Sequence, residues 1–262
     1  MDWRVRGVGL RVGGHRGAAA LAPENTYAGF ALAAEAGADY LELDVQLTAD
    51  GVAVVIHDDD LDRTTDGHGP VAAASWAALR DLDAGTWFDR RFARERMPTL
   101  AGFLAWLEAR PPLGATIEAK GPGSGAAIAA AILASPARPR LSICSFTAAE
   151  LRAAAEVASD VPRLLIVDRD DPGVDLFAAA AGARATGINV PWPWLSGDLV
   201  KRLHGAGLLV AGGTLDDPAE VPACLRLGLD AVDSNRPAII VAARRAALWV
   251  PALRDRMGGD QR

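Results

Sequence analysis

The chain has 262 residues, of which 50% are hydrophobic and 23% are charged, and its formal net charge is −6. This length fits one large domain or two small ones, and the composition is ordinary for a globular protein. The negative net charge gives no global attraction to nucleic acid or to an anionic membrane surface, so neither is predicted as a partner.

The first ten residues alternate charge and glycine and contain no apolar run that resembles a signal peptide. No stretch of the sequence approaches the roughly 18–20 apolar residues of a membrane span. Cys144 and Cys224 are the only cysteines, which predicts reduced, buried thiols and no disulfide framework. We therefore predict a cytoplasmic protein without stable membrane insertion, and no feature of the sequence specifies an oligomer.

From about residue 10 onward, short strands alternate with amphipathic helices. Eight strands are predicted, at Leu10–His15, Asp39–Leu47, Leu113–Glu118, Leu141–Ser145, Arg163–Val167, Thr186–Val190, Leu208–Gly212 and Ala231–Asp233. Seven helices are predicted between them, at Thr26–Ala36, Leu100–Ala109, Ala126–Ala134, Ala148–Ala158, Val174–Ala181, Ser196–His204 and Ala219–Leu227. The last residues, Arg254–Arg262, are expected to fray.

Repeated alternation of strand and helix predicts an α/β fold, a TIM-type (β/α)8 barrel whose usual length of about 250 residues makes residues 1–262 a single catalytic domain. A doubly wound open sheet is the structural alternative. It is disfavoured because no glycine-rich dinucleotide turn follows the first strand.

A further strand, Val52–Ile56, interrupts this rhythm. Only Thr48–Gly51 separates it from the strand before, too few residues for a parallel crossover, and Asp-Gly is a hairpin turn. We therefore predict an antiparallel hairpin that brings His57 back toward the preceding strand. An inserted small subdomain should follow, an excursion of about residues 58–98 placed over the carboxyl end of the barrel.

Three acids and a lysine stand in otherwise apolar strands. Glu42 and Asp44 share one face of their strand, and Glu118 and Lys120 share one face of theirs, because strand side chains alternate. Burying them requires opposing charge, which a divalent cation and an anionic substrate would supply. All-oxygen ligands suit Mg²⁺ or Ca²⁺. The alternative is a set of salt bridges with Arg16 and Lys120, but three acids against two bases leave a negative surplus.

The chain has four histidines, and two of them, His15 and His57, fall at predicted strand ends near the acids. His68 is interpreted as a solvated loop residue and His204 as the last turn of a helix. A phosphodiester needs its negative charge neutralised, its nucleophile deprotonated and its leaving oxygen protonated. Two imidazoles can serve as the acid–base pair, while Arg16 and Lys120 hold the remaining phosphate charge.

The chain resembles the glycerophosphodiester phosphodiesterase family, and the match covers nearly all of the sequence. The motifs occur in order: His15-Arg16-Gly17, Pro23-Glu24-Asn25-Thr26, Glu42-Leu43-Asp44-Val45, Asp50-Gly51, His57-Asp58, Leu61-Asp62-Arg63-Thr64-Thr65, Pro98-Thr99-Leu100, Glu118-Ala119-Lys120, Ser145-Phe146 and Asn235-Arg236-Pro237. The resemblance implies a metal-dependent TIM barrel that hydrolyses small glycerophosphodiesters to sn-glycerol 3-phosphate and an alcohol. It also implies His15 and His57 as acid–base pair, Glu42, Asp44 and Glu118 as ligands of one metal ion, and phosphate contacts from Arg16 and Lys120.

One segment departs from the family pattern. Where such enzymes commonly carry a Trp-Thr-Val-Asn-like stretch, this chain has Gly213-Thr214-Leu215-Asp216, so the aromatic platform expected beside the glycerol is missing. Trp192 and Trp194 could substitute for it, with Phe146, in the substrate pocket, or they cap the barrel rim. Trp87-Phe88 either packs the excursion or lines an acyl or choline site.

Two other functions compete with hydrolysis of small diesters. A lysophospholipase D would use the same centre on a lipid, and an apolar ring around the mouth would favour it. A non-catalytic barrel that binds phosphorylated ligands would need no acid–base pair, and the chain retains both histidines. In the hydrolysis of small diesters, we hold as a hypothesis that the glycerol 2-hydroxyl attacks as an internal nucleophile and gives a cyclic phosphate, which water later opens.

Overall fold

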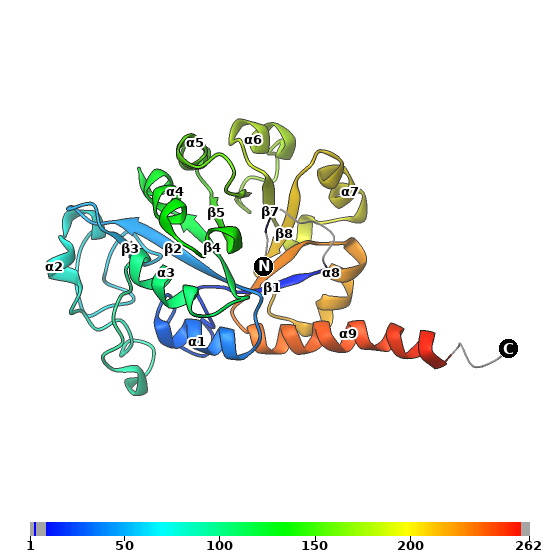
Figure 1. Cartoon of the computed structure of the whole chain (residues 1–262), viewed down its shortest axis with the longest axis horizontal. Coiled ribbons are helices and arrows are strands. Elements are labelled where there is room, and N and C mark those ends of the chain that lie inside the picture. Colours follow the sequence, from blue (N-terminus) through cyan, green and yellow to red (C-terminus); the bar gives the residue numbers. More distant parts are fainter. Residues whose placement is uncertain (1–2, 4–8, 258–262) are drawn as a thin grey trace.

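The computed structural model of the protein describes residue 3 and residues 9–257, with side chains up to residue 249. Within these residues one sheet has the strand order β1-β9-β8-β7-β6-β5-β4-β2-β3, and an added pairing of β1 with β2 closes it (Figure 1). The strands are β1 Arg11–Gly14, β2 Tyr40–Leu47, β3 Ala53–Val55, β4 Gly114–Ala119, β5 Leu141–Ser145, β6 Arg163–Ile166, β7 Gly187–Pro191, β8 Leu209–Gly213 and β9 Ala231–Ser234. All pairings except β2–β3 are parallel, so the predicted TIM-type barrel is confirmed.

Helices surround the ring of strands (Figure 1). They are α1 Tyr27–Glu35, α2 Trp76–Leu79, α3 Leu100–Glu108, α4 Ser124–Ala134, α5 Ala148–Val157, α6 Leu176–Gly182, α7 Gly197–Gly205, α8 Val221–Leu227 and α9 Pro237–Met257. The seven predicted helices correspond to α1 and α3–α8, whereas the long α9 was not predicted. The end that was expected to fray, Arg254–Arg262, begins inside α9, which continues to Met257. Residues 258–262 lie outside the described part of the chain.

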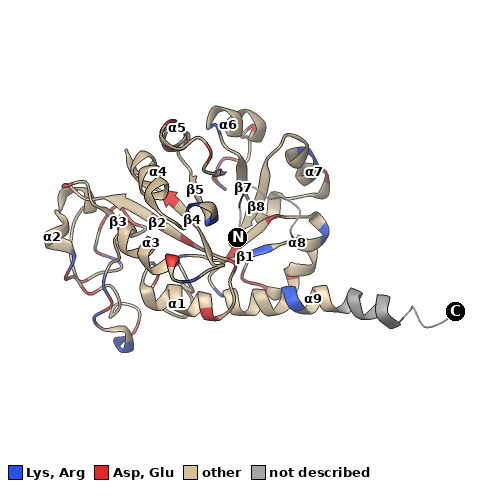
Figure 2. Cartoon of the chain, in the orientation of Figure 1, with Lys and Arg blue, Asp and Glu red and all other residues tan. Residues whose placement is uncertain are grey.

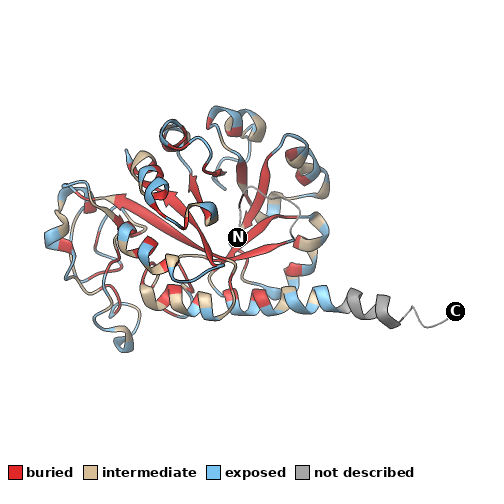
Figure 3. Ribbon diagram, in the orientation of Figure 1, coloured by how far each residue is buried: buried red, intermediate tan, exposed pale blue. Residues whose placement is uncertain are grey.

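The strands are buried on both faces, which is the environment that their apolar runs require (Figure 3). Between the barrel and its helices lie two large apolar clusters, one around β2, β4 and β5 and one around β7, β8 and β9. Hydroxyl side chains cap several of the covering helices: Thr26, Thr99 and Ser196 accept the backbone N–H three residues on, at the starts of α1, α3 and α7. None of the helices in the described residues combines the length and the apolar character that a bilayer crossing requires.

The predicted hairpin is confirmed. β3 runs antiparallel to β2 with Val55 opposite Val45, and Gly51 takes the left-handed conformation, φ 77°, that the tight turn requires. The excursion that follows lies beside β3 and α3 (Figure 1), and it carries both acidic and basic residues (Figure 2). Its own small core includes Leu61, Val71 and Leu79. Its first residues line a pocket with His57 and Lys120, and Thr64, Thr65, Ala84 and Met97 line a smaller one with His57 and Glu24.

Trp3 fills the interior of the barrel. Its side chain is 1% exposed and clusters with residues from β2, β5, β6, β8 and β9, strands that lie all around the ring. The indole packs edge-on against Tyr40, with ring centroids 4.7 Å apart, and its Nε1 donates to the carbonyl of Ala115 at 3.3 Å. Small side chains such as Ala211 and Ala231 leave the room that this large one occupies.

Candidate active site

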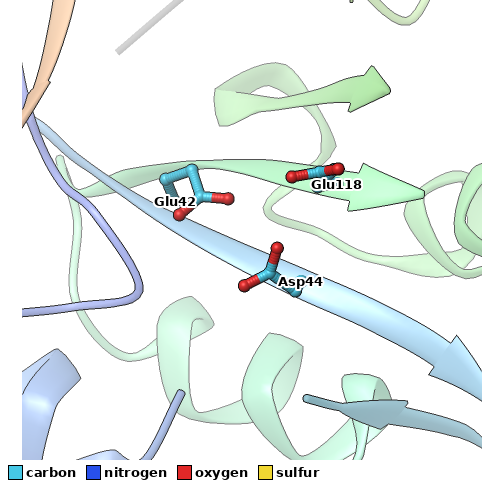
Figure 4. A group of neighbouring side chains, drawn as sticks. All are labelled: Glu42, Asp44 and Glu118. Atoms are coloured by element: carbon cyan, nitrogen blue, oxygen red, sulfur yellow. The ribbon is translucent and has the colours of Figure 1, made fainter. Parts of the chain in front are cut away.

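Two neighbouring strands bring three carboxylates together. Glu42 and Asp44 project from β2 and Glu118 from β4, where Asp44 and Glu118 are register partners. One oxygen of each lies within 4.8 Å of the others, and all three residues are buried (Figure 4). The sequence-predicted trio is therefore assembled at one point of the barrel.

The trio fits a hard divalent cation. Burial and the Asp44 carboxylate raise the pKa of Glu42 well above its usual range, and the same two causes raise the pKa of Glu118 to about 8. Oδ1 of Asp44 is itself buried. Carboxylate oxygens that are crowded and desolvated are suited to coordinate Mg²⁺ or Ca²⁺.

Two cations of the chain stand against these acids. Nζ of Lys120 lies 3.2 Å from Oδ1 of Asp44 and 2.9 Å from Oε1 of Glu118, and Nε of Arg16 lies 3.4 Å from Oδ2 of Asp44. Burial alone would raise the pKa of Asp44, but Lys120 and Arg16 hold it below its ordinary value. Arg16 has φ 51°, a left-handed conformation that lets its backbone N–H donate to Oε2 of Glu42 at 2.9 Å. The salt bridges that the sequence offered as an alternative to a metal are thus present. Three carboxylates against two cations still leave a net negative charge.

His57 follows β3 and is held by a chain of ionic hydrogen bonds. Its Nδ1 lies 2.6 Å from Oδ1 of Asp58, whose Oδ2 accepts from Nε of Arg63 at 2.6 Å. Arg63 in turn donates twice to Glu24, at 2.8 and 2.9 Å. Because Asp58 occupies Nδ1, Nε2 is the nitrogen of His57 left for proton transfer. Burial lowers the pKa of this imidazole, and Asp44 and Asp58 oppose that fall.

His15 follows β1 and is held by a second chain. Its Nδ1 lies 2.7 Å from Oδ1 of Asn235, and Nδ2 of Asn235 donates to Asp216 at 2.7 Å. Asp216 also accepts from Oγ of Ser234 and the backbone N–H of Asn235, both at 2.8 Å. These bonds turn the side-chain carbonyl of Asn235 toward His15, so Nδ1 of His15 is the nitrogen that donates. Nε2 of His15, which lies 4.0 Å from Oε2 of Glu42, is therefore the nitrogen available as a base.

One cavity of about 380 Å³ at the carboxyl end of the barrel joins these groups. It is lined by His15, His57, Glu42, Glu118, Arg16 and Lys120, with Trp3 and Tyr40 deeper in the barrel. Phe146 also lines it and is 51% exposed, with Nζ of Lys120 5.8 Å from its ring centroid. Glu42, Glu118, the histidine pair and both cations therefore face one space, and Asp44 lies buried beside the two glutamates.

The remaining aromatic candidates lie elsewhere. Trp192 and Trp194 pack against the apolar cluster behind β7 and β8 and are not among the residues that line the cavity. Trp87 and Phe88 contact each other edge-on within the excursion. His204 bonds to Asp230, and His68 bonds to Asp62 on the surface.

The structure adds residues that had no predicted role. Glu24, Asn25, Asp58, Arg63 and Asn235 were motif residues without an assigned contact. Four of them hold a histidine, an arginine or Asp44, and Arg63 holds Asp58 and Glu24. Asn189 and Asp233 were not singled out, although each is a polar residue in an apolar strand, the same signal that identified Glu42. Both line the cavity, and burial raises the pKa of Asp233.

The chain is similar to proteins of a phosphodiesterase family. Residues 15–239 match the model of the glycerophosphoryl diester phosphodiesterase family. A probable glycerophosphodiester phosphodiesterase 1 from Mycobacterium tuberculosis is 31% identical over 241 residues, 85% of this chain and 88% of the relative. Two relatives of higher identity, 50% and 55%, align over 43% and 35% of their own length, so the chain spans less than half of either.

Solved structures are similar over most of the chain. A glycerophosphodiester phosphodiesterase from Agrobacterium tumefaciens superimposes with a TM-score of 0.77 and 32% identity, covering 89% of this chain and 99% of that one. A phosphodiesterase from Oleispira antarctica, solved with the product sn-glycerol-3-phosphate, has a TM-score of 0.81 and 29% identity and covers 90% and 96%.

Proposed function

Because this chain belongs to the glycerophosphoryl diester phosphodiesterase family, we propose that it hydrolyses small glycerophosphodiesters to sn-glycerol 3-phosphate and an alcohol. The observation that carries the proposal is one cavity shared by both histidines, Glu42, Glu118, Arg16 and Lys120, with Asp44 buried beside the two glutamates. A binding protein would need the cations but no paired imidazoles with their Nε2 atoms free.

Glu42, Asp44 and Glu118 would hold one Mg²⁺ or Ca²⁺ ion, which when bound neutralises phosphate charge and acidifies a coordinated oxygen. Arg16 and Lys120 lie beside the trio and would contact the phosphate oxygens that remain, which favours the developing charge of the transition state.

His15 and His57 would share the proton transfers. Each has its Nδ1 engaged, by Asn235 and by Asp58, so each presents Nε2 to the cavity. One Nε2 takes the proton of the attacking oxygen while the other protonates the leaving alkoxide, a pairing typically worth about 10²–10⁴ in rate.

The rim of the cavity supports a small diester over a lipid. Besides Phe146 it carries the charged residues Asp168, Arg169 and Asp170, so no continuous apolar ring surrounds the mouth within the described residues. Two buried free thiols, Cys144 and Cys224, support a reducing, cytoplasmic location, which is part of the same proposal.

A substrate panel tests the function. Glycerophosphocholine, glycerophosphoethanolamine, glycerophosphoglycerol and lysophosphatidylcholine are assayed with chelator and with Mg²⁺ or Ca²⁺ added back. We expect cleavage of the first three only, abolished by chelator. His57→Ala should lose turnover with metal affinity near wild type, whereas Glu118→Ala should weaken metal binding. Wild-type turnover by His57→Ala would overturn the acid–base assignment.

A further inference from the structure

The cavity wall has an opening beside Gly213, the last residue of β8. A Cβ placed there would first meet Cβ and Oδ2 of Asp233, at 3.5 and 3.6 Å, and Oδ1 of Asn189 at 3.8 Å. These are ordinary contact distances, so packing does not require glycine at this position. Its effect is to leave room in front of two polar side chains that line the same cavity as the histidines, Glu42 and Glu118.

Asn189 and Asp233 form a fixed pair at this opening. Nδ2 of Asn189 donates to Oδ2 of Asp233 at 3.3 Å, which leaves the carbonyl oxygen of Asn189 as an acceptor toward Gly213. Asp233 is 6% exposed, and its Oδ1 lies toward Gly13 and Tyr40. The Tyr40 hydroxyl is a hydrogen-bond partner of Asp233 and also donates to the carbonyl of Val232 at 3.2 Å. Oδ2 of Asp233 lies toward Gly213, as does Oδ1 of Asn189, so both oxygens that border the opening are acceptors and suit a ligand that donates.

Two acceptors side by side match a group with two donors. A vicinal diol has two hydroxyl donors, whereas a quaternary ammonium has none. The glycerol moiety is common to all glycerophosphodiesters, and a fixed pair suits the constant part of a substrate. We propose that Asp233 and Asn189 bind the two free glycerol hydroxyls in the space left by Gly213, and so select diesters whose glycerol is unacylated. This proposal rests on the proposed function above.

The proposal separates small diesters from lysophospholipids. An acyl chain on the glycerol removes one of the two donors and adds bulk to a space bounded by Gly213, Asn189 and Asp233. A site built to bond a hydroxyl discriminates strongly against a substrate that lacks it, because its own buried acceptor is then left unpaired.

The test compares two substrates in matched variants. Glycerophosphoethanolamine is assayed against its analogue without the 1-hydroxyl, which retains the 2-hydroxyl. Asp233→Asn and Asn189→Leu alter the pair at nearly constant volume, and Gly213→Ala narrows the space without a steric clash. Asp168→Asn is the control, because it removes one acid from the rim of the same cavity without touching the pair.

We expect the wild type to favour the diol by about 10–100-fold in kcat/KM. Asp233→Asn and Asn189→Leu should reduce that preference to within about threefold, and Gly213→Ala should raise KM for the diol, while Asp168→Asn keeps the wild-type preference. An unchanged preference in Asp233→Asn and Asn189→Leu, at wild-type thermal stability, would refute the pair as the glycerol subsite and leave the proposed function standing.

Calorimetry with sn-glycerol 3-phosphate and its 1-deoxy counterpart reads the subsite without turnover. Tighter binding of the diol by the wild type, lost in Asp233→Asn, supports the subsite even if the enzyme cleaves none of the diesters, in which case only the proposed function fails. Equal binding of the two compounds by the wild type overturns the subsite.

Discussion

The two histidines are held by partners of different charge, a carboxylate for His57 and an amide for His15. The hydrogen bond to Asp58 raises the pKa of His57 against the lowering effect of burial. Asp58→Asn should therefore lower that pKa further, and the limb of the pH–rate profile that His57 governs should move to lower pH. A shift of the acid limb identifies His57 as the base, and a shift of the alkaline limb identifies it as the acid.

Asp60→Asn is the matched control for this prediction, because Asp60 is an exposed acid two residues away. Its profile should coincide with that of the wild type. A profile of Asp58→Asn that stays in place or moves to higher pH contradicts the contact. Asp58→Asn should bind metal as the wild type does, since Asp58 is not one of the acid trio.

How much of the site the sequence predicts depends on where its signals lie. Glu42 and Glu118 were identifiable because a charge inside an apolar strand is costly unless it is paired. The partnership of Asp216 with Asn235 was not, because it joins the end of β8 to the end of β9 and depends on the barrel's closure. Contacts across strands become visible only once strand order and register are known.

At the scale of elements, the β2–β3 hairpin depends on its turn. Gly51 has φ 77° and no atom within 4 Å of an added Cβ, so Gly51→Ala introduces conformational strain and no clash. We expect a loss of about 1 kcal/mol in the free energy of unfolding, measured in urea. Gly205→Ala, at the end of α7 and equally uncrowded but without positive φ, should be neutral or gain about 0.5–1 kcal/mol. Equal effects of the two changes would contradict the turn geometry.

Elements with clear turn or stop signals were predicted, whereas α9, with a weak apolar pattern, was not. The hairpin followed from Asp50-Gly51 and the short spacing between its strands, and the helices before Gly37 and Gly228 followed from their stop signals. The long α9 was missed although Pro237 stands at its first position, where proline favours a helix start. Its face against the barrel is narrow, because Ile240 and Val241 are buried whereas Leu248 and Trp249 are exposed. The apolar pattern of the segment therefore did not clearly predict a helix.

The whole molecule depends on closure of the barrel interior, to which Trp3 contributes from the start of the chain. Its side chain is buried in a cluster that includes Tyr40 and Leu209, so Trp3→Ala leaves a large apolar void and should cost about 3–5 kcal/mol of stability. Added indole should restore part of the thermal midpoint, because it can refill that void. Trp249→Ala, which removes a side chain 67% exposed on α9, should change stability by less than about 0.5 kcal/mol. A similar loss in both variants would place Trp3 outside the core.

The acid trio couples the stability of the whole molecule to pH and to metal. The folded protein raises the pKa of Glu118 from 4.5 to about 8, so without metal it retains a proton that the unfolded chain has released. Stability of the metal-free protein should therefore fall as pH rises through this window, and Glu118→Gln should flatten the fall. Added Mg²⁺ or Ca²⁺ at 100 times its Kd should restore about 2.7 kcal/mol to the wild type at pH 8, and less to the variant, whose lost charge weakens the site. Thermal unfolding from pH 5 to 8, with chelator and with each metal, measures both effects. A stability that rises with pH in chelator, equally in both proteins, would mean that these carboxylates are already neutralised by Lys120 and Arg16 and that the site requires no cation.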